Sequence, residues 1–149
     1  MTVNCNDMYV YLECAKQLEV LSILDAGMLF RQIGGISRGL SGGAIDEDCY
    51  IAGIDMGELQ NFPVYNVIYN TIISIDNYRS QLEDEKFDLG VMLGNLNFDN
   101  AKQLEQLLDF MSGHCKYLIV SMKYVSMVDK YVPQKVFRVD DDMYALFNV

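Results

Sequence analysis

The sequence predicts an α/β fold: a three-layer α-β-α sandwich with a mostly parallel sheet and a C-terminal antiparallel hairpin. Short apolar segments alternate along the chain with segments whose apolar residues recur at helical spacing. The apolar segments are nearly continuous, as expected for strands buried on both faces, and right-handed crossovers place helices on both sides of such a sheet. The chain has 149 residues, and we expect a single domain over residues 1–149.

The first part of the chain predicts a helix, a strand and the start of a second helix. The first helix covers residues 8–21, and either Asn6 or Asp7 is expected to cap it. The apolar segment 21–26 ends in a turn and predicts a buried strand. Residues 28–33 are expected to be helical. The apolar residues of the first helix lie at mostly helical spacing: Leu12, Ala15, Leu18 and Val20.

The middle of the chain repeats this order of elements. Residues 49–56 predict a second strand that ends in an acid. Residues 58–72 are expected to be helical after Pro63, which suits the first turn of a helix. Residues 72–76 predict a short third strand, and the polar segment 79–85 has room for one or two helical turns.

Residues 97–113 form the clearest predicted helix, after a fourth strand over residues 87–93. Either Asn97 or Asp99 is expected to cap its start, and Gly113 lies where a helix usually stops. Its apolar residues form one stripe: Ala101, Leu104, Leu107, Leu108 and Met111.

The C-terminal segments predict the close of the sheet. Residues 116–122 indicate a fifth strand. Residues 135–149 contain two strand-like segments around an Asp140-Asp141-Asp142 turn, which indicates a hairpin. Such a hairpin places one antiparallel strand at or near an edge of the sheet.

Charge and composition argue against several classes of partner. The formal net charge is −10 and the 11 Lys and Arg residues are scattered, so we expect no binding to nucleic acid. No apolar run approaches the length that spans a bilayer, and residues 1–14 do not resemble a signal peptide, so we expect a cytoplasmic protein without a membrane partner. The four cysteines form no CxxC pair and are expected to be reduced thiols rather than metal ligands: Cys5, Cys14, Cys49 and Cys115.

Four segments together resemble the class I S-adenosylmethionine-dependent methyltransferases, a Rossmann-like family. Leu24–Gly27 resembles the first motif of that family, and Ile51–Asp55 resembles its second strand, whose terminal acid holds the ribose. Phe87–Met92 resembles its fourth strand, and Leu118–Ser121 with the hairpin resembles its closing order of elements. The resemblance implies that S-adenosylmethionine is the cofactor and that its methionine part crosses the turn after the first strand.

The glycine-rich turn of that family is degenerate in this sequence. The family carries further glycines where Leu29 and Arg31 stand here. Glycine at such positions lets the backbone approach a ligand and adopt positive φ. A leucine there would direct a side chain into that space or toward the cofactor.

Ligands of open α/β sheets bind beyond the carboxyl ends of the strands, near the switch in strand order. Asp55 is the strongest candidate, because a carboxylate at a strand end can accept two hydrogen bonds from a ribose diol; the alternative is a cap for the helix that begins near Glu58. The same rule and the resemblance give the candidate cofactor site: Asp25, Ala26, Gly27, Met28, Asp55, Met56, Asp76, Gly94 and Asn95.

The other polar candidates each have a structural alternative. Asp25 either lies under the turn and binds backbone N–H groups or contacts the amino group of the cofactor. Asp76 either approaches the adenine amino group or caps a helix. Gly94 and Asn95 either form the floor of the pocket near the reacting methyl group or belong to a loop that ends with a helix cap.

His114, the only histidine, follows a helix stop and precedes the fifth strand. This order places it at the amino edge of the sheet, away from the expected site, so its role is expected to be structural. No catalytic residue and no metal site is assigned. Methyl transfer requires the nucleophile to be held in line with the sulfonium methyl group, so positioning can supply much of the rate.

Two functions of different classes remain open. The first is an S-adenosylmethionine-binding, methyltransferase-like protein that acts on a small-molecule acceptor. The second is a degenerate Rossmann-like domain without catalysis that serves as an interaction or assembly module, with a homodimer as one form; it predicts that Leu29 or Phe30 fills the cofactor cleft. A nicotinamide-dependent enzyme is a weaker third possibility, because pyrophosphate binding requires close approach to glycine at a helix N-terminus.

Overall fold

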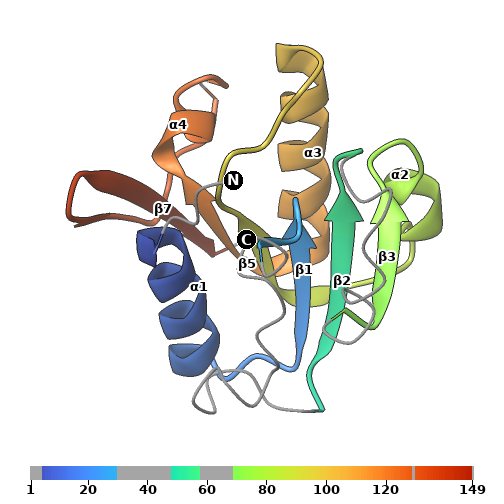
Figure 1. Cartoon of the computed structure of the whole chain (residues 1–149), viewed down its shortest axis with the longest axis horizontal. Coiled ribbons are helices and arrows are strands. Elements are labelled where there is room, and N and C mark those ends of the chain that lie inside the picture. Colours follow the sequence, from blue (N-terminus) through green and yellow to red (C-terminus); the bar gives the residue numbers. More distant parts are fainter. Residues whose placement is uncertain (1–4, 30–47, 58–68, 129, 149) are drawn as a thin grey trace.

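The computed structural model describes residues 5–29, 48–57, 69–128 and 130–148 (Figure 1). Its strands form one seven-stranded sheet. They are β1 (Ser22–Ala26), β2 (Tyr50–Asp55), β3 (Thr71–Ser74), β4 (Phe87–Met92), β5 (Cys115–Ser121), β6 (Lys135–Val139) and β7 (Asp142–Asn148). The helices are α1 (Cys5–Gln17), α2 (Tyr78–Gln81), α3 (Ala101–His114) and α4 (Met122–Val125).

The order of the strands across the sheet is β3-β2-β1-β4-β5-β7-β6. The pairs among β1 to β5 are parallel, and β7 pairs antiparallel with both β5 and β6. The order reverses between β1 and β4, where the chain switches from one half of the sheet to the other. In Figure 1 the arrowheads of β1, β2 and β3 point to the top of the view, so their carboxyl ends meet at one edge.

Helices cover both faces of this sheet. Successive residues of a strand point to opposite faces, so Ile23 of β1 packs on the side of α1 and Leu24 packs on the side of α3. The α1-side core includes Val10, Tyr11, Ala15, Ile23, Ile51, Leu89 and Ile119. The α3-side core includes Leu24, Ile54, Met92, Leu104, Leu107, Leu108, Met111 and Val120. The expected three-layer sandwich with a C-terminal hairpin is therefore confirmed.

The hairpin also lies where the sequence predicts it. Asp140 has a φ of 54°, in the left-handed region that tight turns use. β7 lies between β5 and β6, and β6 is the last strand of the sheet on that side. The expectation of an antiparallel strand near an edge is confirmed.

Both predicted helix caps are wrong. α1 begins at Cys5, so Asn6 and Asp7 lie inside its first turn rather than before it. α3 begins at Ala101, and its cap is Asn100, whose side chain accepts a hydrogen bond from the N–H of Gln103 at 2.9 Å. The short helix α4 was not predicted, because one helical turn is too short to show a periodic pattern.

Some predicted elements lie outside the described residues. These include most of the helix over 28–33 and residues 58–68 of the helix over 58–72. The described end of the latter is not helical, because Thr71 and Ile72 belong to β3. No helix among the described residues is long and apolar enough to cross a bilayer. In the same ranges, no group of three or more His, Cys, Asp or Glu side chains is arranged to hold a metal ion.

Candidate functional site

The turn after β1 lies directly beside the acid at the end of β2. The N–H of Gly27 donates to the carbonyl oxygen of Ile54 at 2.9 Å, which continues the β1–β2 pairing one residue beyond the strand. Asp55 follows Ile54 and is partly exposed, and its Oδ1 accepts the N–H of Gly57 at 2.9 Å. Asp55, the strongest candidate from the sequence, and the turn glycine Gly27 are thus neighbours at the carboxyl edge.

Position 27 requires a glycine for two reasons, its backbone conformation and the side chain that packs against it. Its φ is 87°, a conformation that residues with a Cβ rarely adopt. A Cβ at this position would lie 2.0 Å from Cδ2 of Leu96, closer than any van der Waals contact permits. The loop after β4, which carries Leu96, therefore packs directly against the turn after β1.

Asp25 is buried and binds groups of the protein itself. Its carboxylate accepts the N–H of Leu29 at 3.1 and 3.2 Å and the hydroxyl of Tyr69 at 2.7 Å. A carboxylate that accepts several donors fixes the conformation of the surrounding chain. The alternative in which Asp25 lies under the turn and binds backbone N–H groups matches this geometry.

The remaining residues of this turn belong to the core. Ala26 is fully buried on the α3 side, and Met28 and Leu29 are buried on the α1 side. Met28 has a φ of 54°, and its Cγ would lie 2.6 Å from a Cβ on Gly53. Phe30 lies outside the described residues.

Asp76 lies beyond the end of β3, one strand further along the same edge. Asp76 is exposed, and its N–H donates to Oγ of Ser74 at 3.1 Å. The N–H of Ile75 donates to the carbonyl oxygen of Asp55 at 2.8 Å, so the ends of β2 and β3 are tied together. The residue at the N-cap of α2 is Asn77, so Asp76 does not cap that helix. Met56 is half-buried against the α3-side core.

Gly94 and Asn95 lie in the loop over residues 93–98, which we call the β4 loop. Gly94 is buried with a φ of 84°, and its carbonyl oxygen accepts the hydroxyl of Tyr124 at 2.6 Å. The same hydroxyl accepts the N–H of Leu96 at 2.7 Å. Asn95 is exposed, and its Oδ1 accepts a hydrogen bond from Nζ of Lys123 at 2.9 Å. The two residues therefore belong to a loop that side chains of α4 hold in place.

A buried carboxylate from α1 binds a side chain of β7. Oδ1 of Asp7 accepts the hydroxyl of Tyr144 at 2.7 Å. Burial raises the pKa of Asp7 above its ordinary value of 3.8, while the hydrogen bond from Tyr144 and the charge of Lys123 oppose that rise.

The spacing of Asp7 from later residues of the first helix indicates that its side chain faces inward. Asp7 lies three and four residues before Val10 and Tyr11, which are both buried, so it falls on the inner face of α1. An acid on such a face requires donors. Tyr124 lies two residues beyond the predicted fifth strand over residues 116–122, but its partners in the β4 loop are distant in the sequence and could not be identified from it.

His114 lies at the amino edge, as the sequence predicts. Its Nδ1 is 2.8 Å from the carbonyl oxygen of Phe110, its Nε2 is 3.1 Å from that of Glu83, and its ring stacks on Phe110. It ends α3 immediately before β5. The imidazole therefore joins the end of α3 to the segment after α2, and it does not face the carboxyl edge.

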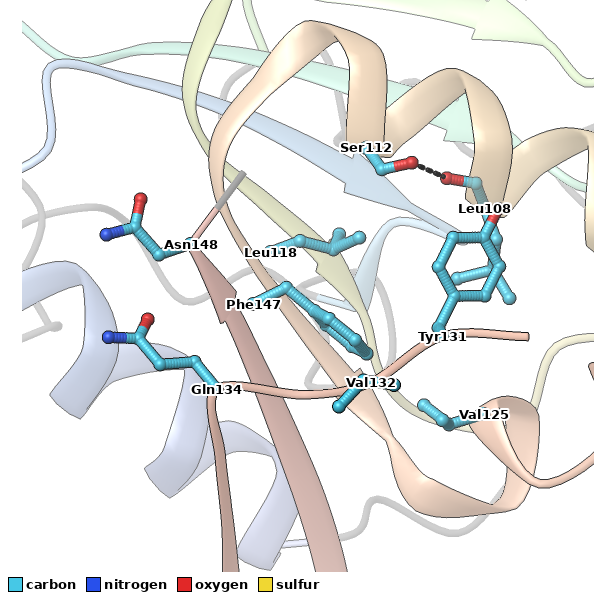
Figure 2. Close-up of a pocket in the computed structure, with 9 residues that line it drawn as sticks. All are labelled: Leu108, Ser112, Leu118, Val125, Tyr131, Val132, Gln134, Phe147 and Asn148. Atoms are coloured by element: carbon cyan, nitrogen blue, oxygen red, sulfur yellow. Dashed lines mark hydrogen bonds between the residues drawn. The ribbon is translucent and has the colours of Figure 1, made fainter. Parts of the chain in front are cut away.

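A separate cavity of about 340 Å³ lies on the α3 side (Figure 2). It is lined by Leu108, Ser112, Leu118, Val125, Tyr131, Val132, Gln134, Phe147 and Asn148. In Figure 2 the ring of Phe147 lies among the apolar side chains, and the amides of Gln134 and Asn148 point away from them. None of the nine candidate residues from the sequence lines this cavity.

Comparisons with known proteins place this geometry in a fold family. No protein-family model and no curated protein matches the sequence. A provisionally assigned caffeoyl-CoA O-methyltransferase from Staphylococcus aureus matches in structure over 100% of this chain and 86% of its own, with a TM-score of 0.66 and 13% identity. The chain has the class I S-adenosylmethionine-dependent methyltransferase fold.

Two further structures share the class I methyltransferase fold with this chain. One is a provisionally assigned O-methyltransferase from Klebsiella pneumoniae, with a TM-score of 0.61 and 12% identity over 97% of this chain and 80% of that one. The other is the 16S rRNA methylase ArmA, with a TM-score of 0.53 and 16% identity over 95% of this chain and 80% of that one. At these identities the likeness concerns the fold.

Within the class I methyltransferase fold, the predicted site residues divide into two groups. The first lies along the carboxyl edge: Gly27, Asp55, Met56, Asp76, Gly94 and Asn95. The second has side chains that lie in the protein interior: Asp25, Ala26 and Met28. The second group shapes the turn that the first group uses.

Proposed function

We propose that this protein binds S-adenosylmethionine and transfers its methyl group to a small-molecule acceptor. The observation that carries the proposal is the hydrogen bond between Gly27 and Ile54, which sets the turn after β1 beside Asp55. Gly27 and Asp55 both lie at the carboxyl edge, next to the switch in strand order between β1 and β4. Open α/β sheets bind ligands at such a switch. The shared fold with known methyltransferases supports the choice of cofactor.

The residues of the carboxyl edge fit the parts of this cofactor. The carboxylate of Asp55 would accept hydrogen bonds from the ribose diol, and Asp76 would accept one from the adenine amino group. Gly27 forms the turn that the methionine part would cross, beside the side chain of Leu96, which occupies the space of a Gly27 Cβ. S-adenosylmethionine supplies an electrophilic methyl group when bound, and the protein has to hold an acceptor in line with it.

The environment of Leu29 supports this fit despite the missing glycine. Leu29 is buried in the α1-side core, and its N–H donates to Asp25. A side chain that packs in the core beneath the turn leaves the carboxyl edge to Gly27 and Asp55. The substitution of a family glycine by leucine is therefore compatible with a cofactor at this edge.

Isothermal titration calorimetry with S-adenosylmethionine and S-adenosylhomocysteine tests the proposal. We expect binding by the folded protein and a loss of about tenfold or more in affinity for Asp55→Ala, because two hydrogen bonds to a carboxylate are removed. Asp84→Ala is the matched control, because it removes the same charge from an exposed residue outside the site, and its affinity should stay within twofold.

Two results would contradict the proposal. The first is the absence of heat at millimolar concentrations of either ligand with folded protein, which would favour the non-catalytic interaction module. The second is an equal effect of Asp55→Ala and Asp84→Ala on ligand affinity, which would show that binding does not depend on the carboxyl end of β2. If the cofactor binds, formation of S-adenosylhomocysteine with candidate acceptors identifies the substrate.

A further inference from the structure

We propose that Tyr124 is a positioning residue: it holds the β4 loop so that Leu96 forms an apolar wall of the cofactor site beside Gly27. This inference rests on the proposed function for its effect on cofactor binding. The hold on the loop itself can be measured without any ligand.

Tyr124 holds the loop through one hydroxyl group that makes two hydrogen bonds. It donates to the carbonyl oxygen of Gly94 and accepts the N–H of Leu96, which uses the donor and an acceptor site of a single phenol. The residue is 4% exposed, so a polar group that loses either hydrogen bond stays buried without water as a new partner, which costs free energy. The ring of Phe98 packs edge-to-face on Tyr124 with centroids 5.8 Å apart, which holds the far end of the same loop.

The bend of the loop lies at Gly94, whose carbonyl oxygen is the acceptor for Tyr124. Its φ of 84° is left-handed, a conformation that glycine adopts readily. The hydrogen bond from Tyr124 therefore stabilises the loop at its bend.

Leu96 is the side chain that this arrangement aims at the site. Its Cδ2 occupies the space that a Cβ on Gly27 would need, and the residue is 9% exposed. Without the bonds of Tyr124, the backbone of Leu96 would be free to move away from Gly27. The side chain would then no longer exclude water beside the turn where the cofactor is expected to lie.

Tyr124→Phe tests the hold, because it removes the hydroxyl and keeps the buried ring. The matched control is Tyr131→Phe, which removes a hydroxyl that contacts Asp109 of α3, away from the β4 loop. Amide hydrogen exchange of residues 93–98 should accelerate at least tenfold in Tyr124→Phe and stay unchanged in Tyr131→Phe. The Kd for S-adenosylhomocysteine should rise about tenfold in the first variant and less than twofold in the second.

Leu96→Ala tests the wall separately, because it leaves the hydrogen bonds of Tyr124 in place and removes only the side chain beside Gly27. It should weaken S-adenosylhomocysteine binding without accelerating exchange of the loop. It also decides the matter if Tyr124→Phe does not fold.

The outcomes separate this inference from the proposed function. Unchanged exchange in Tyr124→Phe would overturn the hold on the loop. Faster exchange with unchanged or tighter ligand binding, in Tyr124→Phe or Leu96→Ala, would overturn the wall and show that Leu96 obstructs the site or lies outside it. A wild-type protein that binds no ligand would refute both the proposed function and the role of Leu96 as a wall of the cofactor site. The exchange measurement alone would then test whether Tyr124 holds the β4 loop.

Discussion

Gly27 adopts a φ of 87° and faces Leu96 at the place where any other residue would carry its Cβ. Gly57 shares the first property, with a φ of 99°, but a Cβ there would meet nothing within 4 Å. A comparison of substitutions at the two glycines therefore separates the free-energy cost of backbone strain from the cost of steric contact. We expect Gly57→Ala to cost about 1 kcal/mol through strain alone, and Gly27→Ala about 2–4 kcal/mol because Leu96 must also move.

Urea unfolding of the two variants measures this difference. The midpoint should fall for both, and clearly further for Gly27→Ala, with an unchanged slope. Equal losses would show that Leu96 yields to the new methyl group at no cost, and would weaken the view that the β4 loop is held against the turn.

The hydrogen bond between Tyr144 and Asp7 gives a pH-dependent prediction. Asp7 has a raised pKa, so the folded state binds its proton more tightly than the unfolded state does. Its contribution to stability is therefore fully present below pH 3.8 and is lost as pH rises through the folded pKa. Above that pKa the carboxylate is charged and buried, and the Tyr144 hydroxyl is its main stabilising partner.

Tyr144→Phe should therefore cost about 1.5–3 kcal/mol at neutral pH, where it deprives a buried charge of a donor. The cost should shrink as pH falls through the pKa of Asp7, because the protonated carboxyl needs that donor less. Urea unfolding at several pH values measures the trend, and Tyr9→Phe on the exposed face of α1 is the control. A cost that is independent of pH would contradict the coupling.

The residues of the site differ in how far sequence could identify them. Gly27 was predicted because it follows an apolar strand and Asp55 because it ends one, and parallel strands bring their carboxyl ends together. Asp7 and Tyr124 were missed because their partners, Tyr144 and the backbone of the β4 loop, are distant from them in the sequence. Only the order of the strands and the conformation of the β4 loop bring these groups together.

At the scale of elements, the apolar pattern predicted the strands well and the helix ends poorly. Three polar residues precede α3, namely Asn97, Asp99 and Asn100, and composition does not distinguish them. Asn100 combines an extended backbone, with φ −161° and ψ 172°, with a side chain that accepts the N–H of Gln103. The backbone conformation of the segment between β4 and α3 therefore determines which residue caps the helix.

Asn100→Ala should lower the free energy of unfolding by about 1 kcal/mol, because the N–H of Gln103 loses its partner. Asp99→Ala is a suitable control: the bond of Asp99 to Oε1 of Gln103 uses its backbone N–H, which the substitution keeps. Chemical denaturation of both variants measures the difference. A larger loss for Asp99→Ala would show that the cap is misassigned.

At the scale of the whole molecule, the formal net charge follows directly from the amino-acid composition. The net charge of −10 implies that self-repulsion opposes the compact state at low salt. The ion pairs of Lys130 with Glu105 and Asp109 are about half exposed, so salt should remove little stability by screening them.

We therefore expect the melting temperature to rise by several degrees between about 10 mM and about 500 mM NaCl, as screening reduces the repulsion. Differential scanning calorimetry at neutral pH measures the change. A fall in melting temperature over this range would show that attractive charge pairs outweigh repulsion in the folded protein.

The hydrogen bond from Tyr144 to Asp7 joins residues that are 137 positions apart in the chain. During synthesis α1 leaves the ribosome well before β7, so a growing chain holds the acid before its donor exists. The carboxylate of Asp7 can gain that donor only after β7 has left the exit tunnel. Gly27 and Asp55 lie between the two partners in the sequence, so both emerge before this bond can form.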